Sequence, residues 1–500
     1  MENNRSRTTS IPFPSKGENS RDPVFEMDPM YALSMVNVFP VGSYGQVRNG
    51  YSVDSTTYGS GSIQFLYELA LKNGTRQLVI AGGGGVYKKG TGTALGSGFT
   101  SNWWEAATYL NTMIMCNGVD QPQQYDGTTL SAANYTGIAD DAKLIDVCVY
   151  KERLYFIDKD NQSVWYGATG TITGALTEFP LGDFFSKGGY CQAISSWTTN
   201  TGSGLQDLLV IISSEGEVLC YSGTDPATDF ALTSRFFLPQ PLGKRRCVKN
   251  IGADLFILHN EGVTNLSSLM QGVDAAGQYT QFNDAIGPTF INATTIYGSN
   301  DGWELFFYPH GNWALINVPT ASSTRAYQHV MNTKTGAWCR FTGINSICWA
   351  LLDGVPYFGG ASGKIYRADY TMADNATGVI DAKVKFAFNY FGVMDRSKAF
   401  HMAVAKVVGS GDIRLKFGLD CDGANESMAG DITINTNDEA TWDTATWDVD
   451  SWSSAETYSS NWEGLQGYGR AGAITVAGKF RAASLRLNSI QVIYELGGYL

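Results

Sequence analysis

The sequence predicts an all-β protein with a central β-propeller-like domain of six or seven blades. The 500 residues include 57 glycines, with 13% aromatic and only 16% charged residues, a composition that favours short strands and tight turns. A hairpin pattern recurs roughly every 46 residues, within the range typical of propeller blades. No window of about 11 residues keeps the spacing of an amphipathic helix. We also expect an N-terminal arm and a C-terminal antiparallel β-sandwich, or platform.

Residues 1–40 are expected to form an N-terminal arm and docking segment. The segment is polar and rich in proline, and such a terminus is usually ordered only when a partner holds it. We therefore expect a chain without residues 1–30 to keep its fold and to lose docking.

Residues 41–372 are expected to form the propeller. Each repeated unit has a short apolar strand, a turn rich in Gly, Asp or Asn, and a second strand with an aromatic residue. The seven units begin at Gln77, Thr112, Arg153, Leu208, Asp254, Glu304 and Val355. One blade cannot cover both of its faces, whereas blades arranged in a ring cover each other. The alternative is an open array of hairpins in two sandwiches.

Residues 375–500 are expected to form the sandwich, because polar and apolar residues alternate along several segments. Trp442, Trp447 and Trp452 are five residues apart, which places successive rings on opposite faces of a strand. These rings either pack in the core, which is the favoured reading, or line a subunit interface.

Charge and cysteine content exclude several classes of protein. The formal net charge is −12, which argues against a protein that binds DNA through a basic face. No run of about 18 apolar residues is present, so no membrane span is expected. The eight cysteines form no CxxC pair, which indicates buried free thiols rather than a zinc or redox site.

No catalytic arrangement is recognisable, and we expect neither an enzyme nor a cofactor. His259 lies in a hairpin turn and is expected to be solvated. A glycosidase would need a pair of carboxylates on one face. Several aspartates lie near strand ends, but they are as readily explained as turn residues. They include Asp158, Asp160, Asp254 and Asp301. Trp103 and Trp104 should place at least one ring outward, where it could stack on a glycan or contact a protein.

Several segments, in this order, resemble one known family. Residues 20–51 contain Arg21-Asp22-Pro23, Asp28-Pro29, Asn37-Val38-Phe39-Pro40 and Arg48-Asn49-Gly50-Tyr51. This run resembles the opening of tail hub, nozzle or tail tube proteins of short-tailed bacteriophages (podoviruses). Residues 117–130 and 252–267 are similar to two further signatures of that family. The repeated Thr-Trp-Asp and the segment 464–472 resemble its C-terminal domain.

The resemblance implies a structural virion protein of the short tail, assembled in the cytoplasm of a bacterial host. Six identical subunits would form a ring below the portal-adaptor, retain the packaged genome and conduct DNA during ejection without reading its sequence. The implied partners are the adaptor (head-to-tail connector) protein and tail fibre, spike or needle proteins. An acidic channel would repel DNA and limit sticking.

The contact residues expected for the adaptor and for neighbouring subunits come from these motifs and from the tryptophans. They are Arg21, Asp22, Pro23, Asp28, Pro29, Asn37, Phe39, Pro40, Arg48, Trp103, Trp104, Trp442, Trp447 and Trp452. The alternative function is a glycan-binding or glycan-cleaving β-propeller that acts as a receptor-binding tail component.

Overall fold

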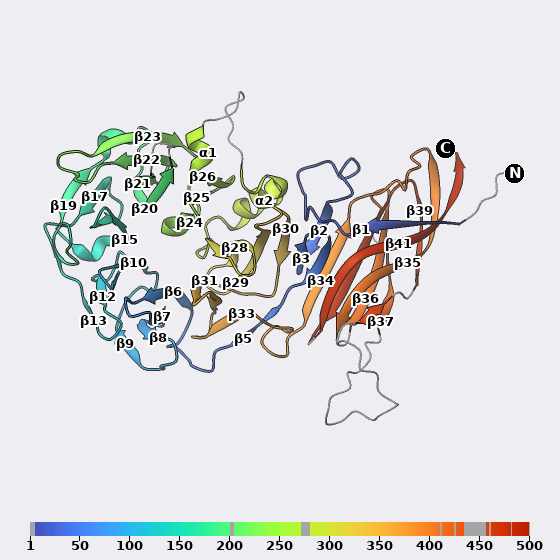
Figure 1. Ribbon diagram of the computed structural model, residues 1–500, viewed down its shortest axis with the longest axis horizontal. Coiled ribbons are helices and arrows are strands. Elements are labelled where there is room, and N and C mark those ends of the chain that lie inside the picture. The colour runs from blue at the N-terminus through green and yellow to red at the C-terminus, as the bar shows by residue number, and fades with distance from the viewer. Residues whose placement is uncertain are drawn as a thin grey trace.

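The computed structural model describes residues 6–200, 205–271, 281–410, 413–424, 427–434, 457–459, 462–481 and 483–499. They form a ring of small sheets beside a β-sandwich (Figure 1). The all-β fold class is confirmed.

The ring is a seven-bladed β-propeller. The first strand of every blade contacts the first strand of the next, from β6 round to β31 and back to β6. Blade 1 holds β6 (Ile63–Ala70), β7 (Arg76–Gly82), β8 (Gly85–Lys88) and β9 (Ala94–Ser97), and blade 2 holds β10 (Glu105–Tyr109), β11 (Thr112–Cys116), β12 (Gln123–Tyr125) and β13 (Leu130–Ala132). Blade 3 holds β15 (Leu144–Tyr150), β16 (Arg153–Asp158), β17 (Ser163–Tyr166) and β19 (Thr177–Pro180), and blade 4 holds β20 (Cys191–Asn200), β21 (Leu205–Ser213), β22 (Glu217–Ser222) and β23 (Ala231–Phe237).

Of the remaining blades, blades 5 and 7 differ from this pattern. Within the described residues, blade 5 has three strands, β24 (Val248–Ile251), β25 (Asp254–His259) and β26 (Gly262–Asn265). Blade 6 has β27 (Glu304–Tyr308), β28 (Trp313–Ala321), β29 (Arg325–Asn332) and β30 (Trp338–Phe341), and blade 7 has β31 (Cys348–Leu352), β32 (Val355–Gly359), β33 (Ile365–Thr371) and β5 (Gly50–Val53). Six of the seven hairpin units are the second and third strands of a blade, whereas the unit at Glu304 is the first and second.

Two helices follow blade 5, which corrects the expectation of a chain almost without helical signal. They are α1 (Leu266–Gln271) and α2 (Gly287–Tyr297). The buried face of α2 carries Phe290, Ala293 and Thr294, so its spacing is helical but small and polar side chains weaken the apolar pattern. Phe290 belongs to the hydrophobic cluster between blades 5 and 6.

Strand β5 closes the ring, because this N-terminal strand is the outermost strand of blade 7 and the chain then continues into blade 1. Its first residue is Gly50, where a Cβ atom would lie 2.0 Å from the carbonyl oxygen of Ala373. Only glycine permits this close approach. The Gly of the Arg-x-Gly-Tyr motif is therefore a requirement of ring closure.

Apolar side chains between neighbouring blades form the propeller core. Each pair of neighbouring blades shares a buried cluster. The cluster at blades 6 and 7 continues into the sandwich, where it includes Val384, Phe417 and Val492. Burial of these faces holds the blades together.

The sandwich has two sheets and takes strands from both ends of the chain. One sheet contains β3 (Val38–Val41), β4 (Tyr44–Val47), β41 (Ser484–Tyr499), β35 (Arg396–Ser410) and β38 (Thr457–Ser459), with β1 (Arg7–Pro12) paired to β41 and β39 (Glu463–Gly469) paired to β35. The other contains β2 (Ala32–Val36), β34 (Ile380–Phe386), β40 (Gly472–Phe480), β36 (Ile413–Cys421) and β37 (Ser427–Ile434).

The expected separate arm over residues 1–40 is wrong for the described residues 6–40. Strand β1 forms six residue pairs with β41, and Ile11 and Phe13 are buried in the sandwich core. Glu18 is buried against Arg340 at 2.7 Å. The chain's own C-terminal domain and blade 6 hold this segment in place, so deletion of residues 1–30 would damage the fold.

Seven of the eight cysteines are buried and free, and Cys421 is partly buried and free, which agrees with the expected free thiols. None of the helices in the described ranges has the length and apolar character needed to cross a membrane.

Candidate functional site at the mouth of the propeller shaft

A pocket of about 470 Å³ lies at one end of the propeller axis. Its walls come from turns after the second strand of a blade (117–119 and 159–160) and from links into the first strand of a blade (101–105, 190–192, 243–246 and 298–302). In an antiparallel blade these connections fall on the same edge. Residues far apart in sequence therefore meet around one opening.

The short 3₁₀ helix Lys244–Cys247 closes the shaft beneath this pocket. It starts from Gly243 and Lys244, whose φ angles of 89° and 55° are left-handed, and this turn directs the next two side chains inward. Arg245 donates to the carbonyl oxygens of Ile145 at 2.7 Å and Trp103 at 3.1 Å. These bonds tie the 3₁₀ helix, which we call the plug, to blades 2 and 3.

Arg246 anchors the other side of the plug. Its Nε donates to Glu105 Oε1 at 2.9 Å and its Nη2 to the carbonyl of Gln64 at 2.8 Å. Its guanidinium lies 4.5 Å from the centroid of the Trp103 ring. Burial disfavours its charge, but Glu105 and Glu304 outweigh that effect, and the pKa of Arg246 lies above its ordinary value.

A second cavity of about 440 Å³ lies within the shaft and is lined by three acidic residues from inner strands, Glu105, Asp146 and Glu304. Both carboxylate oxygens of Asp146 accept backbone N–H groups, from Val147 at 2.8 Å and Ile194 at 2.9 Å. Burial, together with the charge of Glu105, raises the pKa of Asp146 to about 7. Burial also raises the pKa of Glu304, although Arg246 opposes the rise.

Internal hydrogen bonds hold the pocket walls in place. Asn117 is buried, and its Nδ2 donates to the carbonyl of Ser101 at 2.9 Å and to Asp120 Oδ2 at 2.8 Å. Gln192 Nε2 donates to the carbonyl of Lys244 at 3.2 Å. The segment 117–130, one of the family-like signatures, thus begins with residues that shape this wall.

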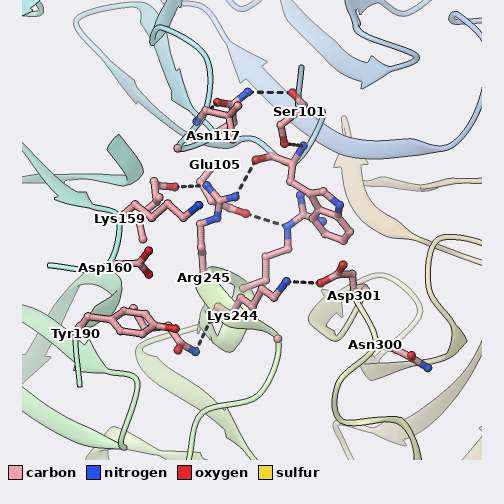
Figure 2. Close-up of a pocket in the computed structure, with 18 of the residues that line it drawn as sticks. Ser101, Glu105, Asn117, Lys159, Asp160, Tyr190, Lys244, Arg245, Asn300 and Asp301 are labelled. Carbon is pink, nitrogen blue, oxygen red and sulfur yellow. Dashed lines mark hydrogen bonds and ion pairs between the residues drawn. The ribbon is translucent and has the colours of Figure 1, made fainter. Parts of the chain in front are cut away.

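The polar groups that remain available lie on opposite sides of the opening. Figure 2 shows Lys159, Asp160 and Tyr190 on one side, Asn300 and Asp301 on the other, and Lys244 between them. Lys244 Nζ pairs with Asp301 Oδ1 at 2.6 Å. Within the described ranges, the side chains of Lys159, Asp160 and Tyr190 have no hydrogen-bonding partner.

The pocket presents groups that can bind a ligand. Across the described part of the chain no group of three or more His, Cys, Asp or Glu residues is placed to hold a metal ion. The shaft carboxylates accept bonds from the protein itself, while the pocket offers donors, acceptors and an aromatic ring. Such a preformed, mixed surface fits a small polar ligand.

Four of the expected contact residues lie inside the molecule, at the junction of the propeller and the sandwich. They are Asn37, Phe39, Pro40 and Arg48, all buried. Their side chains are internal contacts of one chain, which corrects the expectation that they lie on its surface. Phe39 packs edge-on against Trp313 and Phe341, and the carbonyl of Pro40 accepts from Asn332 Nδ2 at 2.8 Å.

Arg48 is the centre of this junction. Its guanidinium donates to both carboxylate oxygens of Asp374 at 2.8 and 2.7 Å, and to the carbonyls of Asn49 at 3.0 Å and Thr342 at 2.6 Å. Its Nε donates to Asn37 Oδ1 at 2.8 Å. All five N–H donors of the side chain are thus used.

Asn37 connects the two domains. Its backbone has a left-handed φ of 55°, a conformation that asparagine tolerates. Its Nδ2 donates to the carbonyl of Asp381 on β34 at 2.7 Å, and its Oδ1 accepts from the backbone N–H of Thr342 beside β30 at 2.8 Å. Strand β2 pairs with both of these strands, so the sheet of blade 6 runs into the sandwich.

The other motif residues of the N-terminal segment are on or near the surface. Arg21 pairs with Asp22 at 2.8 Å and also with Asp284. Asp28 pairs with Lys16 at 2.6 Å. Pro23 and Pro29 are exposed. These five residues remain candidates for contacts with another protein.

The five tryptophans expected at contacts separate into three groups. Trp103 lines the pocket, whereas Trp104 is fully buried and packs edge-on against Phe99 in the cluster between blades 1 and 2. Trp104 is therefore a core residue. Trp442, Trp447 and Trp452 lie outside the described residues.

Of the carboxylates near strand ends, only Asp160 and Asp301 reach the pocket. Asp158 accepts from Asn161 at 2.9 Å, and Asp254 accepts from Asn265 at 2.7 Å. His259 is fully buried and its Nε2 lies 2.8 Å from Thr264 Oγ1, which corrects the expected solvated turn residue. The pocket residues Lys159, Tyr190 and Lys244 were not anticipated, because they lie in separate connections that only the closed ring brings together.

Comparison with known proteins finds no matching family model and no matching curated protein. Among solved structures, YCF48 bound to D1 peptide gives a TM-score of 0.35 at 10% identity, covering 64% of this chain and 95% of that one. An exo-β-1,3-galactanase from Phanerochaete chrysosporium, with galactose, gives a TM-score of 0.25 at 9% identity, covering 77% and 95%. At these TM-scores neither protein's ligand or activity transfers to this chain.

Proposed function

We propose that the chain is a structural protein of a short bacteriophage tail, a hub or nozzle subunit that forms a sixfold ring below the portal-adaptor. In this proposal the ring retains the packaged genome, conducts DNA during ejection and binds the adaptor and the tail fibre, spike or needle proteins. The ordered series of family-like segments supports the proposal.

The single observation that carries it is the junction built by the family-like residues. Asn37 and Arg48 join a propeller blade to the sandwich through buried, saturated hydrogen bonds, and one sheet is continuous between the two domains. Linked domains normally move relative to one another unless their interface is extensive. A continuous junction suits a subunit that keeps a fixed shape within a ring.

The engagement of the shaft carboxylates supports a role without catalysis. A glycosidase needs one carboxyl as an acid and another as a base or nucleophile. Here Glu105 is paired with Arg246, and Asp146 accepts two backbone N–H groups. Both carboxylates are thus engaged by groups of the protein itself.

The closed shaft bears on the route of DNA. Because Arg245 and Arg246 reach from the link into blade 5 to blades 3 and 1, they obstruct the shaft, and a duplex would not run through the propeller itself. In the proposed assembly DNA would pass through the central opening between subunits. The formal charge of −12 per chain, repeated around such a ring, would limit adhesion of the phosphate backbone.

Electron microscopy of phage particles labelled with an antibody against this chain tests the proposal. We expect label on short tails, with sixfold symmetry in averaged views. Recovery of the chain only as free protein, with no labelled particle, would refute the tail-hub function and favour the glycan-binding alternative.

A further inference from the structure

We propose that the pocket at the mouth of the propeller shaft binds a neutral carbohydrate. This site goes beyond the tail-hub proposal and does not depend on it, because the pocket belongs to the single propeller. Its volume of about 470 Å³ falls within the usual range for small-molecule sites and would admit roughly one or two sugar rings.

The pocket is preformed. The wall at Asn117 is bonded to Ser101 and Asp120, and the plug at Arg245 is bonded to two neighbouring blades. On the far side Asn300 Nδ2 donates to the carbonyl of Pro319 at 2.9 Å. A ligand therefore finds its partners already in position, which reduces the entropy lost on binding.

The free polar groups match hydroxyl groups. Lys159 supplies donors only, the carboxylate of Asp160 supplies acceptors only, and the Tyr190 hydroxyl supplies both. Asp301 uses Oδ1 for Lys244 and keeps a second oxygen. A sugar hydroxyl both donates and accepts, so a carbohydrate can bond to groups of each kind, which lie on opposite sides of the pocket (Figure 2).

The charges that line the pocket nearly balance. Four cations line it, Lys159, Lys244, Arg245 and Arg246, against three carboxylates, Glu105, Asp160 and Asp301. Two of the carboxylates are paired internally, with Arg246 and Lys244. Lys159 and Asp160 offer both signs of charge side by side, so a neutral ligand that donates and accepts hydrogen bonds uses both groups, whereas an anion uses only the cation.

Trp103 supplies the apolar surface that a sugar ring needs. The guanidinium of Arg246 lies 4.5 Å from its ring centroid and fixes its orientation, and the ring lines the pocket. The C–H face of a sugar packs on such a ring while its hydroxyls reach the polar side chains. Tyr190, 38% exposed, offers a second aromatic group on the opposite wall.

The test measures binding of methyl glycosides of glucose, galactose, mannose, rhamnose and N-acetylglucosamine by saturation-transfer NMR and tryptophan fluorescence. We expect at least one glycoside to bind with a Kd of about 1 mM or lower. Asp160→Asn and Tyr190→Ala should each weaken that binding about tenfold. Trp103→Ala should abolish it. A second arm uses di- to hexasaccharides of the bound sugar, and tighter binding there identifies a glycan chain rather than a free sugar as the ligand.

Asp353→Asn is the matched control. Asp353, like Asp160, is an exposed hairpin aspartate with a left-handed φ, 52° against 58°, but it follows the first strand of its blade and so lies at the opposite edge. This variant should bind as the unmodified chain does. Failure of every glycoside to bind at about 10 mM would overturn the proposal. Binding that survives Asp160→Asn and Tyr190→Ala would overturn it as well. Because these two side chains have no hydrogen-bonding partner among the described residues, this result does not depend on the folding of Trp103→Ala.

Discussion

Replacement of Arg48 by methionine should be among the most destabilising single changes in this chain. The side chain is fully buried, its ion-pair partner Asp374 is only 10% exposed, and all five of its N–H donors are used. Methionine fills much of the same space and removes the charge. The perturbation therefore isolates the polar network.

The expected loss in the free energy of unfolding comes from the polar groups that would be left without a partner. Asp374 would stay in the interior without its cation, and breaking a buried pair from one side costs about 3–5 kcal/mol. The carbonyl of Thr342 and Oδ1 of Asn37 would each lose a charged donor. We therefore expect a loss of at least about 3 kcal/mol in the free energy of unfolding.

Urea unfolding followed by tryptophan fluorescence and circular dichroism measures this cost. Arg21→Met is the matched control, because Arg21 also pairs with aspartates but its side chain is 48% exposed. Exposed pairs contribute up to about 1 kcal/mol. The double variant Arg48→Met/Asp374→Leu should lose less than the sum of its single changes, since it leaves no unpaired charge.

A loss below about 1 kcal/mol in Arg48→Met, equal to that of Arg21→Met, would refute the reasoning. It would mean that water reaches Asp374 or that the junction does not unfold with the domains. Loss of one unfolding transition while the other is unchanged would show that the domains are independent, and this result would also weaken the argument for a rigid tail subunit.

Four further predictions concern other parts of the chain. Gly50→Ala should cost about 1–3 kcal/mol in urea unfolding, since its Cβ would meet the carbonyl of Ala373; an unchanged midpoint contradicts this. Deletion of residues 1–13 should lower the melting temperature by exposing β41 and removing Ile11 and Phe13 from the core; an unaltered melting curve would restore the detachable arm. Burial and Arg340 lower the pKa of His329 to about 3, so the unfolded chain takes up a proton near pH 6.5 and the folded chain does not. Stability should therefore fall as pH drops from about 6.5 towards 3, less steeply in His329→Phe, and parallel pH profiles would exclude this cause. Cys421 should react first with a thiol reagent at pH 8, because the other seven thiols are buried; the first reacting thiol should vanish in Cys421→Ser.

The repeat of the blades could be predicted from the sequence because each blade has a recognisable local pattern. A hairpin of two apolar strands and a turn is visible wherever both strands are buried between neighbours, which holds for β7–β8 and β21–β22. At Glu304 the predicted position of the hairpin within its blade was wrong. There β27 and β28 are both largely buried and resemble a second and third strand. Helix α2 was missed because Thr294 and Ala293 carry much of its buried face.

Pairing between distant segments could not be predicted from local sequence patterns. Strand β1 has a mostly exposed sequence and pairs with β41 almost 500 residues away, so its order could not be inferred from its own composition. The pocket was hidden for the same reason. Lys159, Tyr190 and Asp301 belong to three different connections, and only the ring brings them together.

Among the described residues, the family-like segments share a property that their residues alone do not reveal: each contains a residue that bonds one part of the fold to another. Asn37 and Arg48 join the propeller to the sandwich. Asn117 bonds one connection to the next. Asp254, in blade 5, accepts from the backbone N–H of Ser267 at 3.1 Å, near the start of α1. In the last segment the carbonyl of Arg470 accepts from the buried ammonium of Lys398 at 2.7 Å. A repeating fold depends on specific residues chiefly at such connections, because apolar side chains of many kinds fill the regular faces of a blade. The resemblance therefore reports architecture, and a ligand at the propeller mouth, bound by Lys159, Asp160 and Tyr190 outside those segments, is free to differ between proteins that share it.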